Sequence, residues 1–102
     1  MREYELYIPL TYNDGSPVEP ERLQQLRASL VEHFGGLTHF HQENEGLWKV
    51  GGTTFRDQIV ILRVLAENAE DAEKFLAGLA RDIQREWRQN DVLIVARDVR
   101  TI

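Results

Sequence analysis

The sequence predicts a single α+β domain, residues 1–102, in which two helices cover one face of a four-stranded antiparallel sheet. Three observations predict this fold. Residues 4–10 alternate apolar and polar side chains, which is typical of a half-buried strand. Two later segments repeat apolar residues at helical spacing, and a Gly-Gly pair separates two long runs with strand character.

The first strand is predicted at residues 4–10, and a turn follows it at residues 13–17, which read Asn-Asp-Gly-Ser-Pro. Pro20 suits the first position of a helix, because its missing N–H has no helical partner there. We expect this helix to end at Gly35, which can adopt a left-handed cap. The apolar stripe of the helix consists of Leu23, Leu26, Leu30, Val31 and Phe34.

Two antiparallel strands are predicted at residues 37–50 and 53–65, because Gly51-Gly52 readily takes the positive φ angles of a tight hairpin. Residues 43–46, Glu-Asn-Glu-Gly, interrupt the first of these strands and indicate a bulge. At ~3.3 Å per residue the hairpin spans about 40 Å, whereas a compact chain of this length is roughly 34 Å wide. We therefore expect its outer end to extend beyond the body of the domain.

A second helix is predicted after Asn68, which can cap it with Asp71 three residues later. Its apolar stripe consists of Ala72, Phe75, Leu76, Leu79, Ala80, Ile83 and Trp87. Residues 92–99 form the last predicted strand and are mostly apolar. The order strand, helix, strand, strand, helix, strand is that of the ferredoxin-like βαββαβ fold, with both helices on one face of the sheet.

Charge and composition exclude several classes of partner. Twelve basic and seventeen acidic residues leave a formal net charge of -5, which argues against binding to nucleic acid. The longest apolar runs are far shorter than the ~20 residues of a transmembrane helix, and the N-terminus lacks the apolar block of a signal peptide. No cysteine is present, so disulfides and thiolate metal sites are excluded. We expect a cytoplasmic protein without nucleic-acid or membrane partners.

The third predicted strand is apolar on both of its faces, although one face of such a sheet is usually polar. The side chains expected on the face away from the helices are Ile59, Ile61 and Leu65. Leaving them in water forgoes about 1.5–3 kcal/mol each. Either the hairpin or the C-terminal tail folds over them, or another copy of the chain covers them. We favour self-association through these three residues, as a dimer or a trimer.

His39 and His41 are the strongest candidates for chemistry. Their spacing places both imidazoles on one side of a strand, followed by Glu43 if the register holds. Imidazoles and carboxylates bind divalent metals such as zinc, copper, nickel or iron, and a histidine can also transfer protons near neutral pH. The alternative is a pair of solvated surface histidines. Apart from such a metal, no cofactor is expected.

Trp48, Arg56 and Asp57 surround the glycine turn, where an indole and a guanidinium could hold an anionic or aromatic ligand. Tryptophan and arginine are also enriched at protein interfaces, and we favour an interface here. No catalytic residue is assigned, because neither Ser16 nor Ser29 has the glycine elbow that exposes a nucleophilic hydroxyl.

Two short motifs carry a resemblance. The run Phe34-Gly35-Gly36-Leu37-Thr38, followed by Gly46-Leu47-Trp48 and a glycine turn, resembles a group of small uncharacterised bacterial proteins. In layout the chain also looks like PII-like trimeric proteins, including the CutA divalent-cation tolerance family, whose common cysteine is absent here. A looser resemblance is to the dimeric α/β barrel monooxygenases and isomerases. The PII-like and barrel resemblances imply homo-oligomers.

These patterns predict a self-associating, non-catalytic binding or interaction module whose ligand is not identified. Two alternatives stay open. One is a PII-like or CutA-like protein that binds a metal or a small ligand. The other is a small cofactor-independent enzyme of the dimeric α/β barrel type, with His39 or His41 as its acid–base group.

Overall fold

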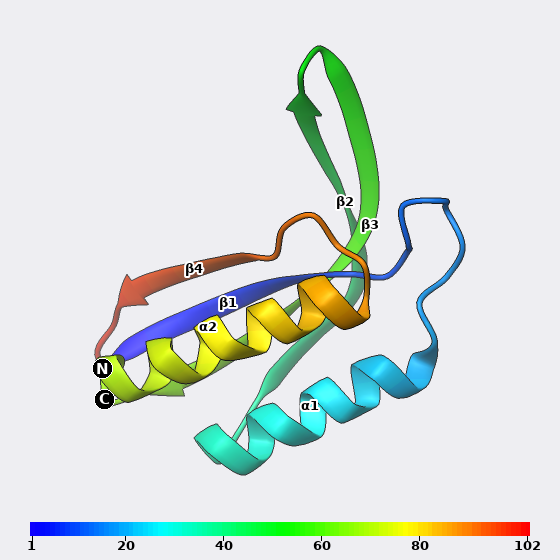
Figure 1. The fold of residues 1–102 in the computed structure, drawn as a ribbon. Helices are drawn as coiled ribbons and strands as arrows, with labels where there is room; N and C mark the ends of the chain where they lie inside the picture. Colours follow the sequence, from blue (N-terminus) through cyan, green and yellow to red (C-terminus); the bar gives the residue numbers. More distant parts are fainter.

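A computed structural model describes the backbone of residues 1–102 and all side chains except those of Glu43, Trp48, Val50 and Phe55. The elements follow the predicted order (Figure 1). They are β1 (Arg2–Pro9), α1 (Pro20–Phe34), β2 (Thr38–Val50), β3 (Thr53–Ala66), α2 (Ala69–Glu86) and β4 (Leu93–Asp98).

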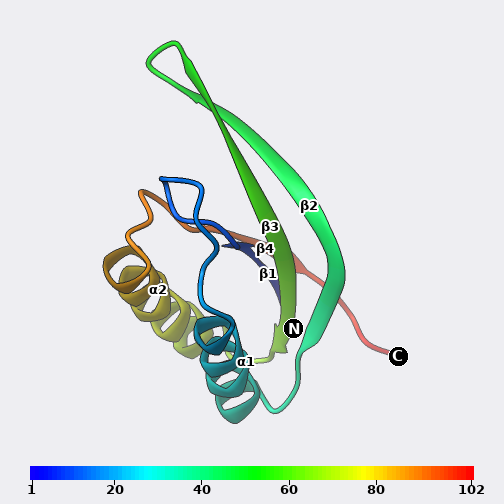
Figure 2. The ribbon, with the colours of Figure 1, turned by 90° about the vertical axis from the view of Figure 1, so that its right-hand side faces the viewer.

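The four strands form one antiparallel sheet in the order β2-β3-β1-β4, and both helices cover the same face of it (Figure 2). This arrangement confirms the predicted α+β class and is compatible with the ferredoxin-like fold. The two central strands, β1 and β3, are not consecutive in the chain, because α1 and β2 lie between them. The opposite face of the sheet, which we call the open face, is free of helices.

The hydrophobic core lies between the sheet and the helices. Alternate residues of β1, such as Leu6 and Ile8, are fully buried and pair with Leu62 and Val60 of β3. The helices contribute buried residues from their predicted stripes, among them Leu30 of α1. The apolar side chains that alternate along the strands and those at helical spacing in α1 and α2 therefore pack into one core.

Local signals fix the ends of the elements. Gly35 adopts φ 80° after α1, and its N–H donates to the Val31 carbonyl at 2.8 Å. Asn68 caps α2, because its side-chain oxygen accepts the N–H of Asp71 at 3.0 Å. Asp71 also contacts His33 at 3.1 Å, which links the end of α1 to the start of α2.

The hairpin of β2 and β3 extends beyond the body of the domain, as predicted (Figures 1 and 2). The hairpin turns at Gly51 and Gly52, which both have positive φ angles. The molecule is elongated and measures 42 × 29 × 25 Å along its principal axes. The structure confirms that β2 is interrupted, but the irregularity lies between Phe40 and Asn44 and so overlaps only the start of the predicted interruption at residues 43–46. From Asn44 to Val50, β2 pairs with β3 in one unbroken register.

The register of β3 confirms that its apolar residues divide between the two faces. Val60, Leu62 and Val64 belong to the core, whereas the intervening residues pair with the open-face residues of β1. The three residues of the predicted interface differ in exposure: Ile59 is buried, Ile61 is half-buried and Leu65 is 43% exposed. Over the described residues, neither helix is long and apolar enough to span a membrane.

Candidate functional site

A hollow of about 580 Å³ opens at the end of the sheet where α1 turns into β2. Its walls come from the α1–β2 turn, from the adjoining ends of β1 and β3, and from the C-terminal tail. Phe34 and Leu65 supply apolar surface to the wall, and its charged residues are Glu3, Arg63 and Arg100. The volume lies within the range of pockets that bind small molecules.

The turn beside the hollow depends on glycine. Gly35 holds a positive φ angle and ends α1, so that the chain can enter β2 from beneath the sheet. A Cβ placed on Gly35 or Gly36 would meet no other atom within 4 Å. The peptide backbone of this turn is therefore open to a small molecule in the hollow.

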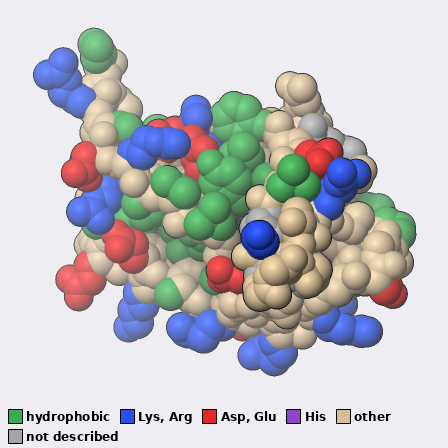
Figure 3. All heavy atoms as spheres, turned by 90° about the horizontal axis from the view of Figure 1, so that it is seen from above, with side chains coloured by type: hydrophobic (Ala, Val, Ile, Leu, Met, Phe, Trp, Pro, Cys, Tyr) green, Lys and Arg blue, Asp and Glu red, His purple; other side chains and the backbone are tan. Residues whose placement is uncertain are grey.

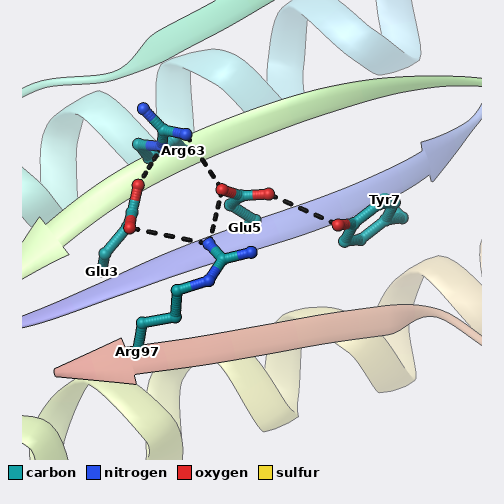
Figure 4. Close-up of polar contacts among 5 residues, drawn as sticks. All are labelled: Glu3, Glu5, Tyr7, Arg63 and Arg97. Carbon is teal, nitrogen blue, oxygen red and sulfur yellow. Dashed lines mark hydrogen bonds and ion pairs between the residues drawn. The ribbon is translucent and has the colours of Figure 1, made fainter. Parts of the chain in front are cut away.

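Beside the hollow, two glutamates and two arginines form a network on the open face (Figure 4). Arg63 Nη2 and Arg97 Nη1 both donate to Glu5 Oε1, at 2.9 Å and 2.7 Å. Arg63 also contacts the Glu3 carboxylate, and Arg97 Nη1 lies 3.6 Å from Glu3 Oε2. The Tyr7 hydroxyl donates to the second oxygen of Glu5 over a longer distance of 3.4 Å. The four charges therefore compensate one another.

Hydrogen bonds from Arg97, and then from Arg63, hold the pKa of Glu5 below its ordinary value. Burial of the carboxyl acts in the opposite direction but is outweighed. The Glu5 side chain, only 8% exposed, is thus ionised at neutral pH. The network supplies fixed charges for binding and positioning, since the arginines keep Glu5 from exchanging protons near neutral pH.

Glu3 and Arg63 belong both to the network and to the wall of the hollow. The hollow is thus lined by the Glu3 carboxylate and the Arg63 guanidinium, which are paired in the network, and by the Arg100 guanidinium, which lies outside it. A guanidinium binds a carboxylate through two parallel hydrogen bonds, and a carboxylate attracts an ammonium or sulfonium group. This combination suits a small molecule that carries both charges.

The structure brings His39 and His41 together, as the spacing predicts. Their rings stack with centroids 4.3 Å apart and planes at 16°. Burial, and then the charges of His41 and Arg27, lower the pKa of His39. His39 pairs with Leu62, so both rings lie on the helix side of β2, on the opposite face of the sheet from the network.

The predicted metal site is not assembled by the side chains that the structure describes. No group of three or more histidine, cysteine, aspartate or glutamate residues is arranged among them to hold a metal ion. Glu43, the third predicted ligand, lies outside the described side chains. A divalent metal at His39 and His41 stays a prediction.

Of the residues predicted around the glycine turn, Arg56 and Asp57 are consecutive in β3 and therefore lie on opposite faces of the hairpin. Arg56 Nε lies 3.2 Å from Glu45 Oε1, and Trp48 is outside the described side chains. Asp57 lies opposite Gly46, on the same side of β3 as Ile59. Its carboxyl is half-buried, and this burial raises its pKa. Along β3, about 20 Å separate Asp57 from Arg63, so Asp57 is not part of the hollow in its own chain.

The sequence reasoning missed the network residues, which come from three strands. Glu3 and Glu5 lie on β1, Arg63 on β3 and Arg97 on β4. The available signal was the polar half of the alternation in residues 2–9, together with a single arginine in an otherwise aliphatic strand. Neither signal indicates which residues meet.

Comparison with known proteins gives a fold. No protein-family model and no curated protein sequence matches this chain. A solved structure of a phage SAM lyase in complex with S-methyl-5'-thioadenosine is similar, with a TM-score of 0.72 over 95% of this chain and 80% of that chain. The structure of a phage SAM lyase in the apo state is similar over 94% and 78%, with a TM-score of 0.71. Sequence identity is 12% in both, so the likeness shows a shared fold.

This comparison corrects the predicted function. We expected a non-catalytic interaction module, but both similar structures are of an enzyme, so the fold is one that an enzyme also adopts and gives no support for the absence of catalysis. The prediction failed because it took the absence of a nucleophile motif as a sign of no catalysis. Fixed charges around a hollow, contributed by separate strands, leave no such motif. The resemblance to PII-like proteins stays a prediction.

Proposed function

We propose that this chain is a small enzyme that binds a zwitterionic metabolite in the hollow beside the α1–β2 turn. S-adenosylmethionine is the compound to test first. The observation that carries the proposal is the placement of Glu3, Arg63 and Arg100 around one hollow. The fold similarity to a phage SAM lyase supports the choice of compound. A cytoplasmic location belongs to the same proposal and agrees with a sequence that contains no cysteine.

Each charged group has a role matched to its chemistry. Arg63 and Arg100 bind the carboxylate of the ligand, and Glu3 attracts its ammonium or sulfonium group. Glu5 and Arg97 are positioning residues, because they hold Arg63 and Glu3 through the network. Phe34 and Leu65 provide apolar surface for an uncharged part of the ligand.

The proposed reaction is a lyase step on the sulfonium. An oxygen of the substrate's own carboxylate forms a bond to the methylene carbon of the amino-acid side chain that is attached to sulfur, and the bond between that carbon and sulfur breaks. The electron pair of the broken bond stays on sulfur, which leaves as the neutral thioether S-methyl-5'-thioadenosine, and the remaining chain closes to a lactone. No proton, water or outside reagent is consumed. The protein contributes orientation, because one carboxylate oxygen is held and the other is directed at the carbon.

The test is incubation of the purified protein with S-adenosylmethionine, followed by chromatography for S-methyl-5'-thioadenosine. We expect the product to form, and we expect Arg100→Met to lower kcat/KM at least about tenfold through the loss of a charge-assisted hydrogen bond. Arg100 is exposed and lies outside the network, so this change leaves the fold intact. Glu32→Gln, at an exposed site on α1, is the matched control.

Two results contradict the proposal. One is the absence of both turnover and calorimetric binding of S-adenosylmethionine. The other is turnover that Arg100→Met leaves at the wild-type rate, because the reaction then takes place outside the hollow.

A further inference from the structure

The open face of the sheet exposes an apolar area that its own chain leaves uncovered. Leu93 pairs with Tyr7 on this face and is 57% exposed, and Leu65 is 43% exposed. Ile61 lies across Tyr7 from Leu93, and Val95 pairs with Glu5; both are half-buried, and the network of Glu5 separates Leu93 from Leu65. In Figure 3, hydrophobic side chains gather on the upper surface of the molecule beside acidic and basic ones. Such an area marks an interaction surface.

The outer part of the hairpin also lacks support from its own chain. Within residues 41–58, no side chain that the structure describes is buried, and Leu47 is 57% exposed. Figure 1 shows the outer ends of β2 and β3 extending away from every other element. A two-stranded ribbon is marginally stable by itself in water, so a surface that packs against it adds stability.

The charges on this face indicate which partner fits. The chain carries a net charge of -5, and two whole molecules therefore repel each other at long range. On the open face, however, Glu3 and Glu5 are compensated by Arg63 and Arg97, so two such faces can meet without net repulsion. Asp57 is the exception, because it forms no ion pair with any described side chain.

We propose that a second copy of this chain covers the open face and supplies an arginine to Asp57. In a two-fold symmetric contact between identical surfaces, the cation of each copy meets the anion of the other copy. One cation and one anion on the same face therefore form two ion pairs across the contact. Arg97 is 50% exposed on this face and is the arginine that we assign to Asp57 of the other copy. Leu93 and Ile61, which lie on either side of Tyr7 in the sheet, form the apolar part of the contact. The inference does not rest on the proposed reaction.

The test compares two substitutions at equally exposed apolar sites. Leu93→Glu places a charge in the proposed contact, whereas Val31→Glu places one on the outer surface of α1, where Val31 is 47% exposed. Light scattering coupled to size-exclusion chromatography gives the mass. We expect a mass of at least two chains for the wild type and for Val31→Glu. For Leu93→Glu we expect a single chain of 11.9 kDa, with an unchanged circular dichroism spectrum.

Asp57→Asn tests the ion pair within the same contact. Sedimentation equilibrium is expected to show a dissociation constant at least about tenfold higher than that of the wild type, because a cation of the partner loses its carboxylate. Glu32→Gln serves as the control for loss of one negative charge. A monomeric wild type, or Leu93→Glu at the wild-type mass, overturns the proposed interface. Wild-type association of Asp57→Asn overturns the ion pair. All masses are measured without substrate, so a failure of the lyase assay leaves this test unaffected.

Discussion

Glu5 is the one charged residue, among the side chains that the structure describes, that is buried. It lies in the middle of β1, and its two oxygens accept from Arg63, Arg97 and Tyr7. A carboxylate taken out of water is tolerated only when donors surround it. The alternation of β1 places Glu5 on the open face, and the neighbouring strands supply the arginines that make this position stable.

Glu5→Gln is expected to lower the free energy of unfolding by about 1–3 kcal/mol at neutral pH, since both arginines lose a charged partner. The pKa of Glu5 is held below its ordinary value of 4.5 in the folded state. The stabilisation is therefore complete above that pH and is lost as the pH falls through the lowered pKa. Urea unfolding over a pH series measures the difference between the two proteins.

The difference should narrow in acid, where the wild-type carboxyl becomes protonated and resembles the amide of the variant. Glu32→Gln, on the exposed surface of α1, should unfold like the wild type throughout. An equal difference for Glu5→Gln at every pH would mean that packing, and not charge, accounts for the effect.

The helices and strands could be predicted because each has a local signal. Gly35 and Asn68 mark helix ends by their own backbone and side-chain chemistry, and the structure confirms both. The hairpin turn follows from the positive φ angles that Gly51 and Gly52 adopt. The bulge in β2 could not be located, because its position depends on which residues of β3 lie opposite, and pairing is a property of two strands.

Two adjacent glycines test the local account of the end of α1. Gly35 has φ 80°, whereas Gly36 has no positive φ angle, and a Cβ at either meets nothing within 4 Å. Gly35→Ala is expected to cost about 1 kcal/mol of stability from backbone strain alone. Gly36→Ala should be neutral or slightly stabilising, because it restricts the unfolded chain. Thermal unfolding of both variants measures the effect, and equal losses would contradict this account.

At the scale of the whole molecule, the candidate site depends on three strands meeting in one register. Glu3 is set beside Arg97 by the pairing of β1 with β4, and beside Leu65 and Arg63 by the pairing of β1 with β3. Glu3, Arg63 and Arg97 are far apart in the chain. The sequence instead favoured His39 and His41, because they are two residues apart on one predicted strand. Such a spacing can be read directly from a sequence. The histidines do stack, but on the helix side of β2, opposite the network.

The central claim is that the hollow between the α1–β2 turn and the C-terminal tail binds a charged adenosyl metabolite. Titration of the protein with S-methyl-5'-thioadenosine and with S-adenosylmethionine, followed in a two-dimensional amide NMR spectrum, tests it most directly. We predict that both compounds shift the amides that line the hollow, Gly36, Thr38 and Thr101, and that the charged one binds more tightly. Shifts confined to the stacked histidines, or no shifts with either compound, would contradict the claim.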